Sequence, residues 1–200
     1  RNAGTNLQTD LGVSTISGNL TVFTNGTITD SGALNVAGAT SLTAGFAGAL
    51  DYDITLDEAN DFGGPVTIIA GDDVTLNDIH AIDLGVSTIS GNLSVTAAGD
   101  ITDSGALNVT GATTLAAGSG NDILLDNAND FGGAVLITNA GHVTLNDIAA
   151  IDLGVSTISG NLAVTAAGAI TDSGAISVEG VTTLAAGSAN AITLDAANDF

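Results

Sequence analysis

Aspartate is the residue of this chain with the greatest capacity for chemistry, and its positions recur at regular intervals. The recurring carboxylates form three sets: Asp30, Asp103 and Asp172; Asp57, Asp126 and Asp195; Asp61, Asp130 and Asp199. A pair of carboxylates could provide the acid and the base of a glycosidase. Glycosidase sites of β-helix enzymes, however, combine acids with basic or aromatic groups in one unique cleft, whereas Arg1 is the only Lys or Arg here. The repetition favours an architectural role, so we predict no catalytic residue and no enzymatic activity.

One glycine-rich turn is a candidate for metal binding. Residues 118–124, Gly-Ser-Gly-Asn-Asp-Ile-Leu, are similar to one turn of a calcium-binding nonapeptide repeat, in which carboxylates and backbone carbonyls supply oxygen ligands. Asp122 and Asp126 are the candidate calcium ligands. A calcium roll needs such turns in tandem, and the equivalent stretch 187–192 has lost its Asp. An ordinary turn is therefore the favoured interpretation, and we predict no other cofactor.

The two histidines are not features of the repeat. His80 stands where the next copy has Ala149, and His142 stands where the preceding copy has Asp73. A zinc site needs several ligands that converge, and isolated histidines at unrelated repeat positions do not provide them. We predict that both side chains are solvated.

Asparagine recurs at Asn60, Asn129 and Asn198, at positions whose neighbours in the repeat pattern are apolar. A buried amide must be hydrogen-bonded, since an unpaired polar group in the interior is costly. We predict that these three residues are structural and lie at inward or corner positions, where each amide satisfies backbone groups of a turn.

The elements that carry these residues are long repeats. The segment Leu-Gly-Val-Ser-Thr-Ile-Ser-Gly-Asn-Leu at 11–20 recurs at 84–93 and 153–162, with offsets of 73 and 69 residues. The four extra residues of the first copy fall between Ala44 and Ile54, which predicts a surface loop there. We predict one continuous solenoid, as part of a longer chain, divided into a divergent segment (1–10), repeat 1 with its insertion (11–83), repeat 2 (84–152) and a partial repeat 3 (153–200).

Within each repeat, apolar residues superpose in steps of 22, 22 and 25 residues. The columns are Leu93, Leu115, Ile137 and Leu162; Ile101, Ile123, Leu145 and Ile170; Val109, Phe131, Leu153 and Val178. The first three members of each column are the predicted core. Alternating apolar residues between glycine-rich turns indicate short strands, and recurrence one coil later favours parallel stacking. The predicted fold is all-β: a right-handed single-stranded parallel β-helix (β-solenoid) with about three coils per 69-residue repeat.

Charge and composition exclude several classes of partner. The net charge is -21, and nucleic-acid affinity comes mainly from Lys and Arg that neutralise phosphates. The longest apolar runs, such as 131–137, are shorter than the roughly 18 residues that a membrane span needs. We therefore expect neither nucleic-acid binding nor membrane insertion by this segment.

Three phrases of the sequence resemble repeats of large filamentous-haemagglutinin-like proteins, the giant bacterial β-strand-repeat surface proteins. They are Asn-Leu-Ser-Val-Thr-Ala-Ala-Gly-Asp-Ile-Thr-Asp-Ser-Gly (92–105), Ala-Leu-Asn-Val-Thr-Gly-Ala-Thr-Thr-Leu-Ala-Ala-Gly (106–118) and Ala-Asn-Asp-Phe-Gly-Gly-Ala-Val (128–135). The resemblance covers nearly all of residues 11–200. It implies a secreted or surface-attached bacterial adhesin or filament, exported by a two-partner or autotransporter-type route, and it transfers no catalytic residue.

These observations lead to one functional prediction and two alternatives. The main prediction is the structural shaft of an extracellular bacterial fibre or giant adhesin. Its expected partners are other copies of itself, or a host or surface receptor or glycan that binds through other regions. A carbohydrate-binding or carbohydrate-active β-helix is the alternative, and it would need a unique cleft such as the 45–53 loop with its single Tyr52. Polymerisation by strand addition between open ends is a further reading.

Overall fold

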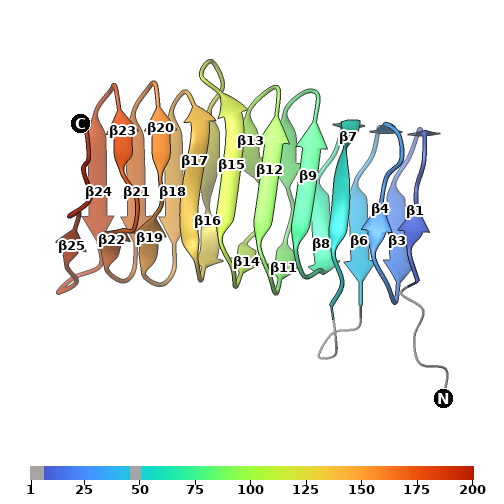
Figure 1. The fold of residues 1–200 in the computed structure, drawn as a ribbon, viewed down its shortest axis with the longest axis horizontal. Helices are drawn as coiled ribbons and strands as arrows, with labels where there is room; N and C mark the ends of the chain where they lie inside the picture. The colour runs from blue at the N-terminus through green and yellow to red at the C-terminus, as the bar shows by residue number, and fades with distance from the viewer. Residues whose placement is uncertain (1–6, 46–50) are drawn as a thin grey trace.

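The protein is a rod of stacked β-strands. The computed structural model describes residues 7–45 and 51–200, and all regular secondary structure in this part of the chain is β-strand. The strand ladders are parallel and follow one another along a single axis, from the N-terminal to the C-terminal end (Figure 1). The all-β parallel β-solenoid predicted from the repeat is confirmed. None of the described residues belongs to a helix with the length and apolar character needed to cross a membrane.

The first broad face of the rod is built from ten strands in nine successive steps of one coil each. In order they are β1 (Thr9–Asp10), β4 (Ile28–Thr29), β7 (Ile54–Phe62), β9 (Val74–Asp78), β12 (Leu93–Ala97), β15 (Thr113–Gly118), β17 (Ala134–Ala140), β19 (Ile151–Leu153), β22 (Ile170–Asp172) and β25 (Ile192–Thr193).

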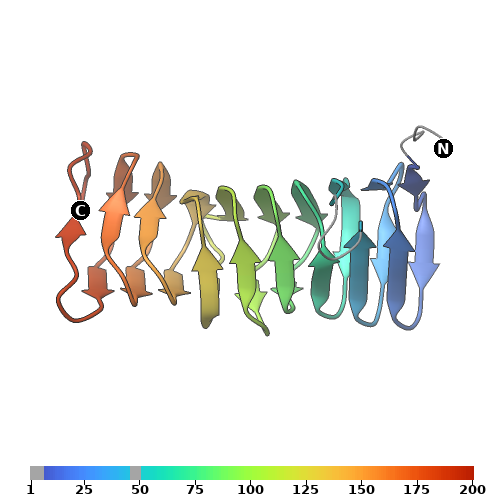
Figure 2. The same cartoon turned by 90° about the horizontal axis from the view of Figure 1, so that it is seen from below.

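The second broad face contains nine strands, which remain aligned along the rod when it is viewed from below (Figure 2). They are β3 (Leu20–Thr24), β6 (Thr40–Ala44), β8 (Val66–Ala70), β10 (Ile82–Leu84), β13 (Ile101–Asp103), β16 (Ile123–Phe131), β18 (Val143–Asp147), β21 (Leu162–Ala166) and β24 (Thr182–Ala186). Short strands complete the coils: β2 (Ser14–Ile16), β5 (Leu34–Val36), β11 (Ser87–Ile89), β14 (Leu107–Val109), β20 (Ser156–Ile158) and β23 (Ile176–Val178).

Two nine-residue strands bend around a corner of the coil. The first part of β7 pairs with β4 and β9, whereas Asp61 and Phe62 at its end pair with β5. The register with β9 shifts between Leu56 and Asn60, which places Asn60 at the bend. β16 repeats this arrangement, with Asn129 at the bend. The corner therefore needs a residue whose side chain can replace the backbone hydrogen bonds that the interrupted ladder lacks.

Successive repeats lie half a turn apart around the rod. The equivalent strands β3, β12 and β21 belong to the second, first and second face, and β7, β16 and β25 belong to the first, second and first. Between β3 and β21, two repeats apart, the second face advances by seven coils. One repeat therefore spans three and a half coils, which refines the predicted value of about three, and a coil contains about 20 residues.

The structure corrects most of the predicted steps within a repeat. Three steps are register partners: Ile101 to Ile123, Val109 to Phe131 and Leu115 to Ile137. The other predicted steps are wrong, namely Leu93 to Leu115, Ile123 to Leu145, Phe131 to Leu153, Ile137 to Leu162, Leu145 to Ile170 and Leu153 to Val178.

The physical reason for these errors is the period of the strand. Leu93 pairs with Thr113 and Ile123 pairs with Val143, so two predicted steps are two residues too long. A shift of two residues leaves every side chain on the same face of a strand, and apolar columns superpose equally well in both registers. The pattern fixes which side chains point inward, but it does not fix the length of a coil.

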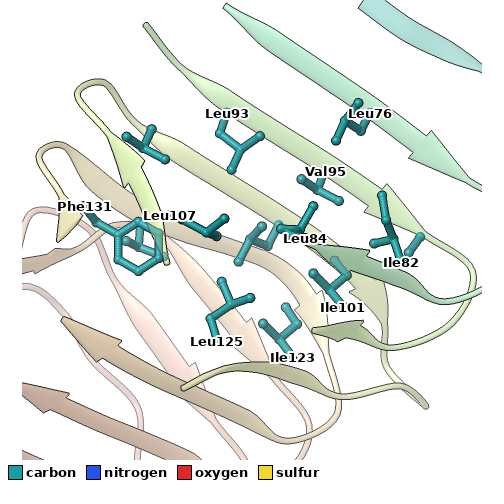
Figure 3. Packing of buried hydrophobic residues seen from close by; sticks show 14 of the residues in the cluster. Leu76, Ile82, Leu84, Leu93, Val95, Ile101, Leu107, Ile123, Leu125 and Phe131 are labelled. Atoms are coloured by element: carbon teal, nitrogen blue, oxygen red, sulfur yellow. The ribbon is translucent and has the colours of Figure 1, made fainter. Parts of the chain in front are cut away.

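The core is one continuous apolar column inside the coils. Figure 3 shows Leu, Ile and Val side chains from both faces meeting across the interior, with Phe131 among them. All nine residues predicted as core are buried: Leu93, Val109, Leu115, Ile101, Ile123, Phe131, Ile137, Leu145 and Leu153. Burial of each such side chain contributes roughly 1.5–3 kcal/mol, and every coil adds to the same column.

Candidate functional site

The recurring Asn at the corner is the centre of a buried polar ladder. Asn129 is completely buried, and its Oδ1 accepts the backbone N–H of Leu107 at 2.8 Å. Its Nδ2 donates to Oδ2 of Asp103 at 2.8 Å. Equivalent bonds join Asn60 Nδ2 to Asp30 Oδ2 at 2.7 Å and Asn198 Nδ2 to Asp172 Oδ2 at 2.6 Å. The Asn side chain thus supplies the acceptor that the backbone lacks where the strand bends.

A second buried aspartate continues the ladder on the other side of the Asn. Asp147 is the register partner of Asn129 and is 1 % exposed. Its Oδ2 accepts the N–H of Phe131 at 2.9 Å, and its Oδ1 accepts the N–H of Ala149 at 2.6 Å. Burial raises the pKa of Asp147, and these two backbone donors counteract part of that increase.

Asp78 occupies the same place in the first repeat. Its oxygens accept the N–H groups of Phe62 and His80, and burial likewise raises the pKa of its carboxyl group. Asp78 and Asp147 were not among the site residues predicted from the sequence. The signal was the segment Thr-Leu-Asn-Asp-Ile, which recurs at 75–79 and 144–148.

Asp30, Asp103 and Asp172, one in each repeat, act as acceptors for the backbone of a neighbouring coil. Oδ1 of Asp103 accepts the N–H of Asp126, and Oδ1 of Asp30 accepts the N–H of Asp57. At Asp172, the hydrogen bond from Asn198 holds the pKa of the carboxyl group below its ordinary value. Satisfying backbone groups is a structural task, and each repeat uses the same residues for it.

Polar side chains also form columns at the start of the strands on both faces. On the first face, Oδ1 of Asp73 accepts the N–H of Asn92 at 2.8 Å. On the second face, Nδ1 of His142 accepts the N–H of Asn161 at 2.9 Å. His142 therefore takes over the acceptor role of its counterpart Asp73, which requires an unprotonated Nδ1.

The candidate calcium ligands are exposed and lie apart from any group of converging ligands. Oδ1 of Asp122 accepts the N–H of His142 at 2.7 Å, and the Asp122 carboxylate lines a shallow groove of about 210 Å³ with Asp100. Within residues 7–45 and 51–200, no group of three possible ligands includes Asp122 or Asp126. The hydrogen bonds are those of a turn in a coil.

Tyr52 and His80 were also considered in the sequence, and the surroundings of both differ from those expected in a binding cleft. The 45–53 loop lies partly outside the described residues. Tyr52 is half-buried and packs against the core, while its N–H donates to Ala44 O at 2.9 Å. His80 is exposed, as predicted for a solvated side chain, but its Nδ1 lies 3.2 Å from Oδ1 of Asp61.

A comparison with protein families also finds three repeats in the chain. The family model described as "Repeats of unknown function (DUF5649)" matches residues 2–69, 71–138 and 140–200. The chain belongs to this family. Each DUF5649 repeat contains one complete or partial copy of the Asn–Asp corner, at Asn60, Asn129 and Asn198. No curated protein and no solved structure gives a significant match.

The DUF5649 matches begin at a different point of the repeat from the divisions predicted from the sequence. The matches start at 2, 71 and 140, whereas the predicted divisions start at 11, 84 and 153. In a continuous solenoid the phase of the repeat is arbitrary, because each coil contacts only its neighbours.

Proposed function

We propose that this chain is part of the structural shaft of an extracellular bacterial fibre or giant adhesin. The observation that carries the proposal is the renewal of the same buried ladder and the same core in each repeat. The last strands of each repeat pair in parallel with strands of the next repeat. The axis of the rod therefore continues without a break from β1 to β25. Such a solenoid extends by addition of coils, and each added coil makes a longer, stiff rod.

Two features support a location outside the cell: the segments that resemble filamentous-haemagglutinin-like repeats, and the strongly negative net charge of the chain. A net charge of -21 keeps neighbouring rods apart at low ionic strength and lets cations control their association. In this proposal the shaft projects a receptor-binding or glycan-binding region, or associates with other shafts.

The first experiment measures length against repeat number. Parallel strands lie about 4.8 Å apart, so three and a half coils lengthen the rod by about 17 Å per repeat. Proteins with two, four and six copies of residues 84–152 should give rods of constant width and linearly increasing length in electron micrographs. Particles that grow in width instead would contradict a shaft.

The second experiment concerns location. Antibodies raised against the purified chain should label filaments on intact cells of the source bacterium by immunogold microscopy. Labelling that appears only after the cells are permeabilised would overturn the extracellular assignment and leave the rod architecture intact.

A further inference from the structure

One corner of the first repeat brings two carboxylates and an imidazole together. Asp61 lies near the end of β7, Asp78 ends β9, and His80 follows in the next turn. One possible ligand atom from each residue lies within 4.8 Å of those of the other two. Among the described residues, this is the one group of three side chains with that property.

The buried member of the group is held in place by the backbone. Asp78 is 1 % exposed, and its Oδ1 and Oδ2 accept the N–H groups of His80 and Phe62 at 2.7 and 2.9 Å. A carboxylate oxygen has two lone pairs, so each oxygen keeps one for a further partner. Asp78 is therefore a fixed ligand with spare coordinating capacity.

The other two members can adjust to an ion. The side chains of Asp61 and His80 are 33 % and 67 % exposed, and Nδ1 of His80 already lies 3.2 Å from Oδ1 of Asp61. In a tetrahedral zinc site with bonds of about 2.0–2.2 Å, ligand atoms lie about 3.3–3.6 Å apart. Asp61 Oδ2 also accepts a hydrogen bond from Asn35 Nδ2 at 3.1 Å, so binding of an ion would close the wider separations mainly by rotation of the His80 ring.

The charge of this corner also favours a cation. Two carboxylates meet here, and Arg1 is the only Lys or Arg of the whole chain. Positive charge at this corner therefore comes from His80 or from a bound ion. A bound ion has the advantage that it satisfies both carboxylates and leaves the imidazole neutral.

We propose that Asp61, Asp78 and His80 form a binding site for one divalent transition-metal ion of the zinc class. Imidazole nitrogen together with carboxylate oxygen suits Zn²⁺, Co²⁺ or Ni²⁺, whereas Ca²⁺ and Mg²⁺ take oxygen ligands. Three protein ligands leave a further coordination position for water. The site goes beyond the proposed shaft function and is independent of it.

The chain contains two internal controls. The second repeat has the same carboxylates, Asp130 and Asp147, but Ala149 replaces the histidine and is exposed. The other histidine, His142, accepts a backbone hydrogen bond at Nδ1, so that lone pair is already used. If His80 belongs to a metal site, its response to metal must differ from that of the second-repeat corner and from that of His142.

The test is a titration of the intact chain with Zn²⁺, followed by NMR of its two histidine rings. About 150 mM salt and excess Mg²⁺ suppress loose binding to the acidic surface. One equivalent of Zn²⁺ should shift the ring signals of His80 and leave those of His142 unchanged. Equal shifts of both histidines, or no shift of His80, would overturn the proposal.

Two matched variants measure stoichiometry by calorimetry under the same conditions. His80→Ala, which copies the second repeat, should weaken the tight binding step by at least about tenfold, or roughly 1.4 kcal/mol. Ala149→His should raise the number of tight sites from one to two. Circular dichroism verifies that both variants are folded, and unchanged binding by a folded His80→Ala protein would show adventitious binding only.

Discussion

Nδ2 of Asn129 donates to Oδ2 of Asp103 at 2.8 Å, although the two residues are 26 positions apart in the sequence. The bond links one coil to the next inside the rod, at a corner where the backbone ladder is interrupted. Since the same pair recurs at Asn60 and Asp30, the solenoid depends on this polar contact as well as on apolar burial.

Asn129→Asp should strongly destabilise the rod. The change replaces the donor to Asp103 with a second carboxylate, so two negative charges face each other in a buried corner. We expect a loss of about 3 kcal/mol in the free energy of unfolding near neutral pH, measured by urea denaturation. Exchanging the pair, Asp103→Asn with Asn129→Asp, restores a donor and an acceptor and should recover part of the loss. Additive effects of the two substitutions would contradict direct coupling.

Thr113→Val should stabilise the protein. The Oγ1 atom of Thr113 is buried and has no hydrogen-bond partner, as is also the case for Thr40 and Thr182. Valine has nearly the same shape and removes the unpaired hydroxyl, which should contribute about 1 kcal/mol of stability, seen as a higher midpoint in urea. Thr114→Val on the outward side of the same strand should leave the midpoint nearly unchanged. A lower midpoint for Thr113→Val would mean that the hydroxyl has a partner, such as a buried water.

Gly133→Ala should destabilise the stacking of coils. A Cβ atom at this position would lie 2.5 Å from the carbonyl oxygen of Gly111 in the preceding coil. Backbone atoms cannot rotate away, so we expect a cost of about 2 kcal/mol in thermal or urea unfolding. Gly120→Ala is the matched control, since nothing lies within 4 Å of its Cβ position. Equal stability of the two variants would disprove the close approach.

The buried Asp147 predicts a specific pH dependence. Because burial raises its pKa above 3.8 in the folded state, its contribution to stability is fully present below 3.8 and is lost as the pH rises through the raised pKa. The destabilisation caused by Asp147→Asn should therefore decrease between about pH 3 and about pH 7 in urea titrations.

Asp172 provides the control of opposite sign. Its pKa is lowered by the hydrogen bond from Asn198, so its contribution is present above 3.8 and is lost as the pH falls through the lowered pKa. The cost of Asp172→Asn should be largest near neutral pH. If both substitutions followed the same trend with pH, the two aspartates would not have the environments described.

The sequence predicted the parallel solenoid because identical motifs recur at 11–20, 84–93 and 153–162, and equivalent residues stack most simply in parallel. It did not predict the length of a coil, since Leu115 fits above Leu93 as well as above its actual partner Val95, which lies on the same side of the same strand. Only the hydrogen-bond register distinguishes them.

The candidate site was also only partly accessible from the sequence. Asn129 stood out because an amide interrupted an apolar column. Its partner Asp103 stood out only as one of nine recurring aspartates, and Asp147 did not stand out at all, since the sequence does not distinguish a buried aspartate from a solvated one in so acidic a chain. The approach of His80 to Asp61 depends on a step of 19 residues, and the predicted steps of 22 and 25 did not bring the two together.

The half-turn between repeats affects how such a rod can lengthen by gene duplication. Insertion of one extra repeat adds three and a half coils, so all sequence downstream emerges with its two broad faces exchanged. Insertion of two repeats adds seven coils and restores the original orientation. A lineage that displays a particular outer surface toward its surroundings is therefore expected to gain or lose these units in even numbers.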